Sequence, residues 1–321
     1  MKKDLRIKSI VVLAVFLFVS LSFFPTLDAN SAIGVENSAA STQSGLKLTF
    51  LVDNNTKTNY YFRGEAAFST LIEVDNKKIL FDTGFSDAFL KNAQQMRISM
   101  LDLDYVALSH GHLDHTWGLA PLTKYYTEAG FGNISYKKPT LIAHPSAFEP
   151  KERTDEVQIG SIFSQEQLSC FFNMKINKKP VWITDNLVFL GQIERKNDFE
   201  AKTPVGVHKN GKPDFVDDDS ALVYKSPDGL VIITGCAHAG ICNTIEYAKK
   251  VCKDDRIVDV IGGFHLMNQT DEQIAPTLNY LKNTNAEALH ACHCVDLNAK
   301  IALSKVTNLQ EVYVGQTLSF K

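Results

Sequence analysis

Three histidines and one aspartate lie within the six-residue segment HGHLDH, residues 110–115, directly after a short apolar run. Neutral imidazole and ionised carboxylate are the ligands that borderline divalent metals such as zinc prefer. His110 and His112 are two residues apart, so in an extended segment their side chains project to the same side and can bind one ion. Asp114 and His115 follow after a bend and suit a second ion, as in two-metal hydrolytic sites.

A chance accumulation of histidines in a polar loop is the alternative explanation for this segment. The chain has nine histidines in 321 residues, and three of them fall within residues 110–115. Their position directly after an apolar strand also favours a functional cluster. The segment therefore predicts a centre with one or two divalent ions, zinc above all, with manganese or iron as alternatives.

The HxHxDH motif after a strand resembles the metallo-β-lactamase superfamily, an α/β fold that forms a four-layer α/β/β/α sandwich and mostly hosts hydrolases with one or two metals. The resemblance runs from about Leu46 to Phe320 and implies one domain, residues 46–321. The blocks FDTG, SHGHLDHTWGL, GCAHAGICNTIEYA, IGGFHL and CHC look like one branch of it. Members of that branch are commonly named 7,8-dihydropterin-6-yl-methyl-4-(β-D-ribofuranosyl)aminobenzene 5′-phosphate synthases, or simply metal-dependent hydrolases.

The resemblance places the further ligands at the ends of later strands. In most of the superfamily the strand corresponding to residues 230–234 ends in Gly-Asp, and that aspartate bridges both metals, whereas this chain has Cys236 there. His238 is the expected replacement ligand, with Cys236 close to the metal and a single-ion site left open. Ligation by the Cys236 thiolate is the alternative, because a metal deprotonates a coordinating thiol. The last histidine ligand of the superfamily corresponds to His293.

Three polar residues are expected to support these ligands. Asp82 in Asp-Thr-Gly resembles a buried residue that braces the metal loop, since ligating histidines usually need a partner on their other nitrogen; an aspartate that caps an ordinary turn is the alternative. Asp114 is also expected to take a proton during catalysis. His265 ends a neighbouring strand and is expected to contact the substrate or transfer a proton, because imidazole titrates near neutrality. A structural role is the alternative for His265.

Arg195 and Trp117 are the expected substrate contacts. Arg195 can hold an anionic group through two parallel hydrogen bonds, and a surface ion pair is an equal alternative. Trp117 is expected to form a wall of the pocket or a packed cap. For His144, a structural role is favoured over that of a third ligand of the first ion. The acidic residues 217–219 are expected to form a solvated turn.

Alternating and continuous apolar runs predict strands that end at these residues, with helices between them. Together they predict two sheet layers covered by helices. The expected strands are residues 46–52, 67–74, 78–81, 101–108, 139–143, 187–193, 221–224, 230–234, 257–263, 286–291 and 311–314. One expected helix is capped by Ser86 and another starts near residues 116–119; the others cover residues 241–252, 271–281 and 297–306. Residues 151–177 are expected to be irregular and to pack over the pocket mouth.

The N-terminal residues differ in composition from the rest. Four basic residues precede an apolar run of about 15 residues, and small residues follow that can support cleavage. This run is shorter than the roughly 20 residues that span a bilayer as a helix. A cleaved signal peptide over residues 1–32 and export are therefore predicted, with an uncleaved membrane anchor as the alternative. Residues 33–45 are predicted to be a flexible linker.

Composition narrows the range of partners. The net charge is −3 and the basic residues are scattered, which argues against a nucleic-acid-binding protein. A small-molecule substrate is expected, with no membrane contact beyond the signal peptide, and the oligomeric state is left open. Among the six cysteines, Cys236, Cys292 and Cys294 are interpreted as residues that line or neighbour the site more than as a disulfide framework, because a domain this large needs no disulfides; the pairing is left open.

A divalent ion held by neutral histidines lowers the pKa of a bound water towards ~7, which favours hydrolysis at physiological pH. The expected function is an exported metal-dependent hydrolase acting on a small ester or phosphoester. The synthase activity, which is a transferase reaction, is one alternative. A non-catalytic metal-binding protein on the same fold is another, suggested by Cys236 in place of aspartate.

The ligand assignment predicts that His110→Ala or His112→Ala abolishes metal binding. His290, expected in a strand interior, is the matched control: His290→Ala should lower stability and leave the metal content unchanged. Metal analysis of the purified variants measures this. Comparable metal occupancy in all three variants would overturn the assignment.

Overall fold

The structure of the protein is a computed structural model, and it describes residues 45–321. The predicted signal peptide, residues 1–32, and the predicted linker up to residue 44 lie outside the described residues. Within residues 45–321, no helix combines the length and the apolar character that crossing a bilayer requires.

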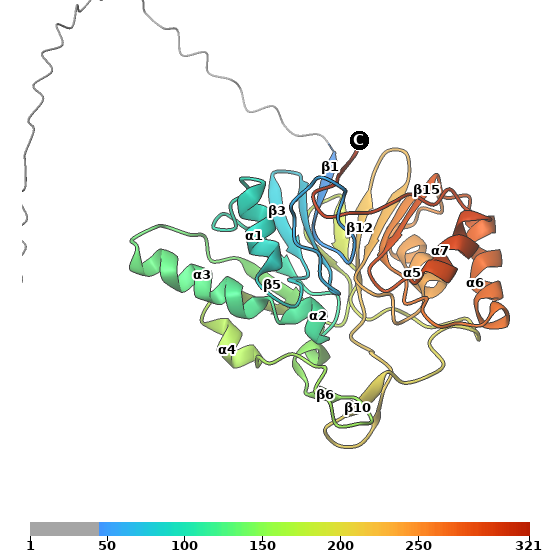
Figure 1. The fold of residues 1–321 in the computed structure, drawn as a ribbon, viewed down its shortest axis with the longest axis horizontal. Helices are drawn as coiled ribbons and strands as arrows, with labels where there is room; N and C mark the ends of the chain where they lie inside the picture. Colours follow the sequence, from blue (N-terminus) through green and yellow to red (C-terminus); the bar gives the residue numbers. More distant parts are fainter. Residues whose placement is uncertain (1–44) are drawn as a thin grey trace, which may run out of the picture. The chain divides into compact units, whose positions relative to one another are not determined.

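Two large β-sheets form the centre of residues 45–321 (Figure 1). The first has the strand order β16-β1-β2-β3-β4-β5-β7, and the second has the order β15-β14-β13-β12-β9-β8. The strands of the first sheet, in chain order, are β1 Leu46–Val52, β2 Ser69–Val74, β3 Lys77–Phe81, β4 Tyr105–Ala107, β5 Thr140–Ala143, β7 Asn173–Ile176 and β16 Thr317–Phe320. Those of the second are β8 Val181–Trp182, β9 Leu187–Phe189, β12 Ala221–Lys225, β13 Leu230–Thr234, β14 Ile257–Gly263 and β15 Ala288–Cys292. A small sheet is formed by β6 Lys151–Glu152, β10 Gly206–His208 and β11 Pro213–Asp214.

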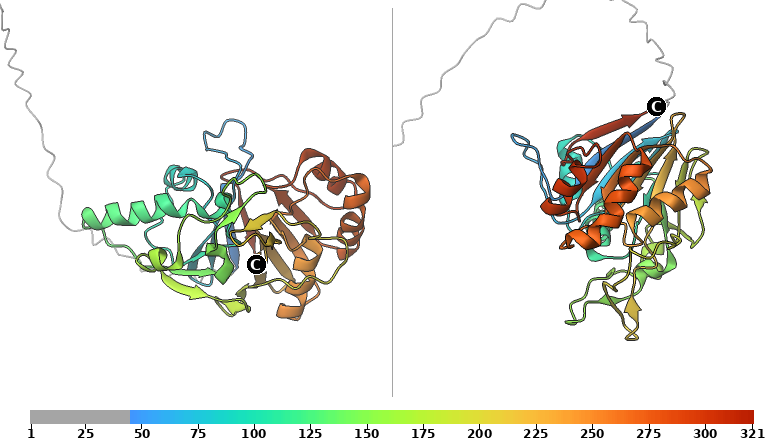
Figure 2. Two further views of the ribbon diagram at one scale, coloured as in Figure 1. Left: turned by 90° about the horizontal axis from the view of Figure 1, so that it is seen from below. Right: turned by 90° about the vertical axis from the view of Figure 1, so that its right-hand side faces the viewer.

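Helices cover the outer faces of the two large sheets (Figures 1 and 2). The helices, in chain order, are α1 Ala88–Gln95, α2 Leu113–Thr116, α3 Leu119–Phe131, α4 Gln165–Ser169, α5 Ile241–Cys252, α6 Asp271–Thr284 and α7 Leu297–Ser304, with a 3₁₀ turn at Pro145–Phe148. Helices α1 and α3 pack their apolar residues on the first sheet, and α5, α6 and α7 pack on the second. A third apolar cluster, with Phe81 and Ile233 among its members, fills the space between the sheets. The predicted four layers are present.

The predicted apolar patterns explain most of these elements. Every residue of β13 is buried, as expected for a strand covered on both faces. In α5 the residues predicted to share one face are all buried, namely Ile241, Ile245, Ala248 and Cys252. Helix α6 begins at a capping box, in which Thr270 accepts the N–H of Gln273 and Gln273 reaches back to the Thr270 backbone.

Several predicted elements differ from the structure. The strands predicted over residues 101–108 and 187–193 are shorter, as β4 and β9, and residues 151–177, predicted to be irregular, contain β6, α4 and β7. The expected strand at residues 311–314 is not formed, because only Val314 pairs there, through one bridge to Thr56, and β16 closes the first sheet instead. Asp87, not the predicted Ser86, is the N-cap residue of α1, although the Ser86 hydroxyl does accept the Ala88 N–H at 3.1 Å.

The core between the sheets predicts a matched pair of stability effects. Ile233 is fully buried there, so Ile233→Ala should lower the free energy of unfolding by about 2–5 kcal/mol. Ile301 on α7 is 46% exposed, so Ile301→Ala should change it by less than about 1 kcal/mol. Denaturant unfolding followed by circular dichroism measures both values. Equal losses would contradict the placement of the core between the sheets.

Candidate metal centre

Three buried imidazoles from two strand ends form the first ligand set. His110 and His112 follow β4, and His238 follows β13. The ring centroids of His110 and His112 are 4.6 Å apart, and each lies 4.8 Å from the His238 ring. All three side chains are buried. The structure therefore brings together residues that are more than a hundred positions apart in the sequence.

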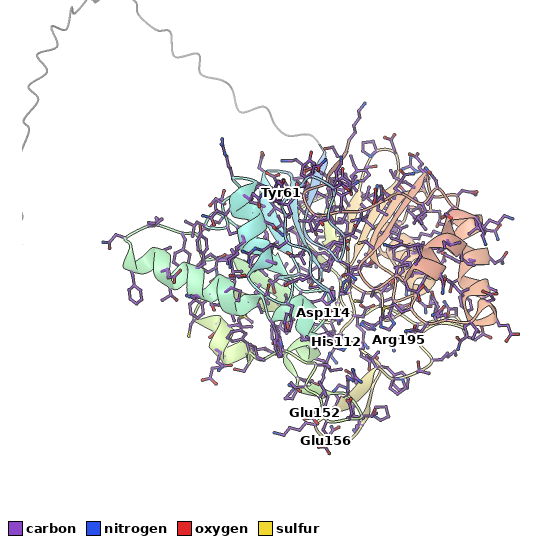
Figure 3. The ribbon with its side chains drawn as sticks, in the orientation of Figure 1. Tyr61, His112, Asp114, Glu152, Glu156 and Arg195 are labelled. Atoms are coloured by element: carbon purple, nitrogen blue, oxygen red, sulfur yellow. The ribbon has the colours of Figure 1, made fainter. Side chains whose placement is uncertain are left out.

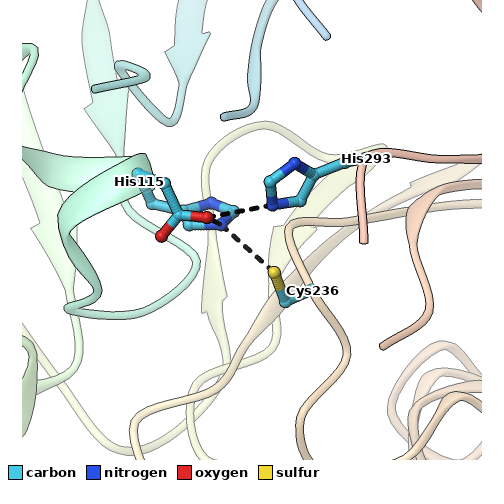
Figure 4. Close-up of side chains that lie close together, drawn as sticks. His115, Cys236 and His293 are labelled. Carbon is cyan, nitrogen blue, oxygen red and sulfur yellow. Dashed lines mark hydrogen bonds and ion pairs between the residues drawn. The ribbon is translucent and has the colours of Figure 1, made fainter. Parts of the chain in front are cut away.

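Four side chains form the second ligand set (Figure 4). Asp114 and His115 lie in α2, and His293 follows β15. An oxygen of Asp114 lies 3.1 Å from Nε2 of His293 and 3.4 Å from Nε2 of His115. Sγ of Cys236 lies 3.2 Å from the same His115 nitrogen. The ligand atoms of these four residues all lie within 4.8 Å of one another.

The state of the first set fits a bound cation. Among residues 45–321, the buried Nε2 atoms of His112 and His238 have no hydrogen-bond partner. Buried polar atoms of this kind are unfavourable unless a ligand satisfies them. Burial lowers the pKa of His110 and His238 well below the usual value, and lowers that of His112 to about 3. These imidazoles are therefore neutral, which is the form that binds a metal.

The second set is held by opposite charges. Burial favours the neutral forms of His115 and Asp114, but their mutual attraction and the Asp82 carboxylate outweigh it. The pKa of His115 is therefore raised well above its usual value, and the pKa of Asp114 is held well below its own. Asp114 is thus an ionised ligand, and a cation at His115 Nε2 takes the place of a proton.

Asp82 fixes the orientation of His115. One Asp82 oxygen lies 2.7 Å from His115 Nδ1 and accepts the Ser109 hydroxyl at 2.7 Å, while the other accepts the Ser109 N–H at 2.7 Å. The ring consequently turns Nε2 towards Cys236 and Asp114. A Cβ at Gly235 would collide with the Ser109 hydroxyl, so only glycine allows β13 to approach this network. The structure places Asp82 where the predicted bracing role requires it.

Asp53 and Asn54, at the end of β1, hold His293 and are absent from the sequence predictions. Asp53 accepts the His293 N–H at 2.9 Å. Asn54 donates to the His293 carbonyl at 3.0 Å, and its side-chain oxygen lies 3.3 Å from His293 Nδ1. The sequence signal was available, because the polar run Asp-Asn-Asn directly follows an apolar strand, as the HGHLDH segment does.

The prediction of a solvated acidic turn is wrong for Asp218 and Asp219, which are both buried. Asp218 accepts the Gly111 N–H at 2.8 Å with one oxygen and the ammonium of Lys151 at 2.5 Å with the other. Asp219 accepts the Ala239 N–H at 2.8 Å. The two carboxylates therefore fix the backbone beside both halves of the first ligand set. Lys151 is itself fully buried, at the start of the segment that was predicted to be irregular.

Non-glycine residues with left-handed backbone conformations lie at several of the strand ends that carry the site. The φ angles of Asp82, Ala237, His265 and His293 are 57°, 54°, 50° and 53°. This conformation is uncommon for residues with a Cβ and costs about 1–3 kcal/mol each. Such strain is typical of functional sites, where the surrounding structure holds it in place.

A pocket of about 550 Å³ opens onto both ligand sets. Figure 3 shows His112 and Asp114 near the centre of the folded domain, between its N-terminal and C-terminal halves. A second hollow of about 440 Å³ adjoins the pocket, and His265 and Met267 line both of them. Arg153 is a cationic residue at the pocket wall. His265 is thus placed where a bound molecule would contact it.

Arg195 and Trp117 do not line either hollow in the described chain. Arg195 donates through Nη2 to the carbonyls of residues 215 and 216, at 2.6 and 3.0 Å, and so holds the loop before the Asp218–Asp219 pair. Trp117 donates through Nε1 to the Gly160 carbonyl at 2.9 Å. Both contacts are structural, and the predicted substrate contacts of these two residues have no geometric support in this structure.

Other predicted residues also lie apart from the ligand sets. His144 accepts the Ser146 N–H at 3.1 Å, and His290 lies 2.7 Å from a carboxylate oxygen of Asp259. The six cysteines, which all fall in the described part of the chain, are free thiols. Cys236 and Cys294 line the pocket.

With the geometry established, a sequence profile decides the family. The profile of the metallo-beta-lactamase superfamily matches residues 63–249, more than half of the chain. The chain belongs to the metallo-β-lactamase superfamily. The match includes Asp82, the HGHLDH segment, Cys236 and His238, and it confirms the fold class expected from the motif.

Similar proteins match this chain over most of its length. An uncharacterized protein of Methanocaldococcus jannaschii is 31% identical over 273 residues, 84% of this chain and 99% of the relative. A protein of the same organism named 7,8-dihydropterin-6-methyl-4-(beta-D-ribofuranosyl)-aminobenzene-5'-phosphate synthase is 28% identical over 293 residues, 86% of this chain and 97% of the relative. The crystal structure of Tm1679, a metal-dependent hydrolase of the beta-lactamase superfamily, is 27% identical, with a TM-score of 0.72 and coverage of 86% of this chain and 99% of that one.

The network around Asp82 predicts that Asp82→Asn weakens metal binding about 10–100-fold. The neutral amide lacks the negative charge of the carboxylate, whose oxygen contacts both the Ser109 hydroxyl and His115 Nδ1. Asp75 is the matched control, since it contacts Thr184 and Asn186 far from the ligands in sequence and structure. Competition with a metal-binding dye measures the affinities. Equal affinities for the Asp82→Asn and Asp75→Asn variants would contradict the bracing role.

Because Lys151 and Asp218 form a buried ion pair, replacing one of them should greatly lower the stability of the protein. Lys151→Met leaves the Asp218 carboxylate buried without its cation and should lower the free energy of unfolding by about 3–5 kcal/mol. The double variant Lys151→Met/Asp218→Leu should regain part of that loss. Arg153→Met, a change of an exposed cation two residues further on, is the control and should stay within about 1 kcal/mol. Urea unfolding of the wild type and the three variants measures these free energies. A Lys151→Met variant as stable as Arg153→Met would contradict the prediction.

Proposed function

We propose that this protein is a metal-dependent hydrolase of a small ester or phosphoester. The observation that carries the proposal is the convergence of two sets of buried ligands at one pocket. A pocket of about 550 Å³ falls within the range of ~300–1,000 Å³ that small-molecule sites occupy. Imidazole and thiol donors favour zinc among the common divalent ions, with iron or manganese as alternatives. The name of the similar structure Tm1679 also supports a hydrolase.

The residues around the pocket supply binding and proton transfer. When bound, a divalent cation supplies a Lewis acid that activates water and polarises a carbonyl or phosphoryl oxygen. The Asp114 side chain is ionised and 26% exposed, so its carboxylate can accept a hydrogen bond from a water on the pocket side and orient that water. His265 lies against His238 at 4.2 Å between ring centroids and faces both hollows, where its ring can donate a proton to a leaving oxygen. Apolar Leu113, Ile159 and Val205 line the same pocket and limit the access of water.

A specific observation favours a second candidate. The relative named as the dihydropterin-linked synthase is 28% identical over almost its full length, so the same site in this chain is a candidate for that transferase reaction. A non-catalytic metal-binding protein is the third possibility, suggested by Cys236 in the position of the bridging aspartate. We also propose export, on the basic, apolar and small residues of the N-terminus. An exported chain would be separated from cytosolic pterin precursors, which favours the hydrolase; cell fractionation tests this directly.

Substrate assays of the purified full chain separate these proposals. The hydrolase proposal predicts cleavage of chromogenic phosphodiesters or esters that falls at least ~100-fold on chelation and returns with zinc. His265→Ala should reduce kcat about 10²–10⁴-fold at unchanged metal content, whereas His208→Ala, outside the pocket lining, should leave it unchanged. Turnover only with a dihydropterin pyrophosphate donor would replace the hydrolase by the synthase. Metal binding without either activity would favour the non-catalytic protein.

A further inference from the structure

In the described part of the chain, two groups of possible metal ligands share Cys236, and the first of these groups has Cys236 where the first ligand set above has His112. In each group the ligand atoms lie within 4.8 Å of one another. The groups are His110, Cys236 and His238, and Asp114, His115, Cys236 and His293. Two donors on one tetrahedral ion, at bond lengths of about 2.0–2.3 Å, lie about 3.3–3.8 Å apart, so a group within 4.8 Å needs only small side-chain shifts to close on an ion. The Cys236 sulfur is therefore near coordination range of both groups at once.

We propose that the thiolate of Cys236 is a single bridging ligand of a two-ion centre, and that it takes the place of the aspartate that most of the superfamily uses. The sequence left this thiol as an alternative to His238. The structure removes the competition between them, because His238 belongs to the first group alone and Cys236 to both. The two residues are therefore ligands together.

The Cys236 side chain is buried beside the second ligand set. It follows Gly235 at the end of β13, and its sulfur lies 3.2 Å from His115 Nε2. Cys294 is the other pocket thiol, but it belongs to neither group. Its sulfur accepts the His265 N–H at 3.2 Å and its S–H points to the Cys236 carbonyl at 3.7 Å. The Cys294 and Cys236 side chains also contact each other. Only the Cys236 sulfur, however, lies within both ligand groups.

Charge balance also favours a shared thiolate. The other donors of the first group are neutral imidazoles, and the second group holds one carboxylate, Asp114. Two divalent ions close together repel each other strongly in a buried site. An anionic sulfur between them attracts both and supplies the first group with its negative charge. A metal deprotonates a coordinating thiol, so the thiolate forms as the ions bind.

A bridging sulfur makes the metal preference testable. Thiolate ligands select zinc, cobalt, iron and cadmium over magnesium and manganese, which prefer oxygen ligands. The chain is therefore expected to bind zinc or cobalt far more tightly than manganese. This inference rests on the proposed function only in requiring that ions bind, and its tests need no substrate.

Titration of the metal-free full chain with Co²⁺ tests the bridge, because a thiolate–cobalt bond gives a charge-transfer band in the near ultraviolet. The wild type should bind two equivalents, and the band should grow through both of them. A band that saturates after the first equivalent would show a terminal thiolate and overturn the bridge. Two bound equivalents without any band would overturn it as well, and would leave the hydrolase proposal standing.

Variants locate the sulfur. Cys236→Ala should lose the band and weaken the second equivalent at least ~10-fold, whereas Cys236→Asp should bind two equivalents without the band. Cys294→Ser, the neighbouring thiol, should keep both the band and the stoichiometry. Loss of the band in Cys294→Ser and its survival in Cys236→Ala would overturn the assignment.

A measurement on the wild type tests the bridge without relying on a variant that could fail to fold. In the chain loaded with ¹¹³Cd²⁺, both cadmium resonances should shift downfield through bonding to sulfur and should couple to each other through it. One shifted resonance beside one typical of nitrogen and oxygen ligands alone would overturn the bridge. Absence of substrate turnover by the zinc-loaded chain, with the two coupled resonances present in the cadmium-loaded chain, would overturn the proposed hydrolase and not the bridge.

Discussion

The structure depends on one constraint, the burial of several imidazole rings so close together that their free nitrogens face each other. Nε2 of His110 and Nδ1 of His112 share one hydrogen bond at 3.0 Å, and the His238 ring packs against both rings. The buried Nε2 atoms of His112 and His238 have no partner in the described chain, and their desolvation is unfavourable. A divalent cation changes the balance, since each nitrogen then has a partner. The fold is therefore best understood as a scaffold that holds these rings in place for an ion.

Carboxylates from separate elements hold that arrangement. Asp82 after β3 orients His115, Asp53 after β1 fixes the backbone of His293, and Asp218 before β12 fixes the turn between His110 and His112. Each carboxylate is buried, and each acts on a ligand that belongs to another part of the chain. The left-handed residues at the strand ends are tolerated because these contacts hold them. Rigid strands and charged hydrogen bonds thus position the ligands before any ion binds.

The local parts of this account could be predicted from the sequence. The HGHLDH segment contains its ligands within six positions, and apolar runs such as β13 and β14 indicate buried strands without knowledge of their neighbours. His238 and His293 could be placed through the family resemblance, since nothing local distinguishes them. Their convergence with the HGHLDH segment is a property of the sheet order, in which β13, β14 and β15 are parallel neighbours.

The features that the sequence did not predict depend on contacts between residues far apart in the chain. Lys151 and Asp218 are 67 positions apart, so neither sequence neighbourhood shows that the two charges are buried together. For Arg195 the sequence left a substrate contact and a surface ion pair as equal alternatives; the structure has the ion pair, with Asp217 at 3.6 Å, together with backbone carbonyl contacts that no side-chain pattern reveals. The closing strand β16 is an edge strand with alternating exposure, and it gives a weaker apolar signal than residues 311–314, which pair only through an isolated bridge.

Anomalous X-ray scattering at the zinc absorption edge, from crystals of the protein grown with zinc, tests the central claim most directly. The account predicts two anomalous peaks on either side of the Cys236 sulfur, one among His110, His112 and His238 and the other among Asp114, His115 and His293. The absence of any peak at these rings, with the imidazoles still packed against one another, would contradict it.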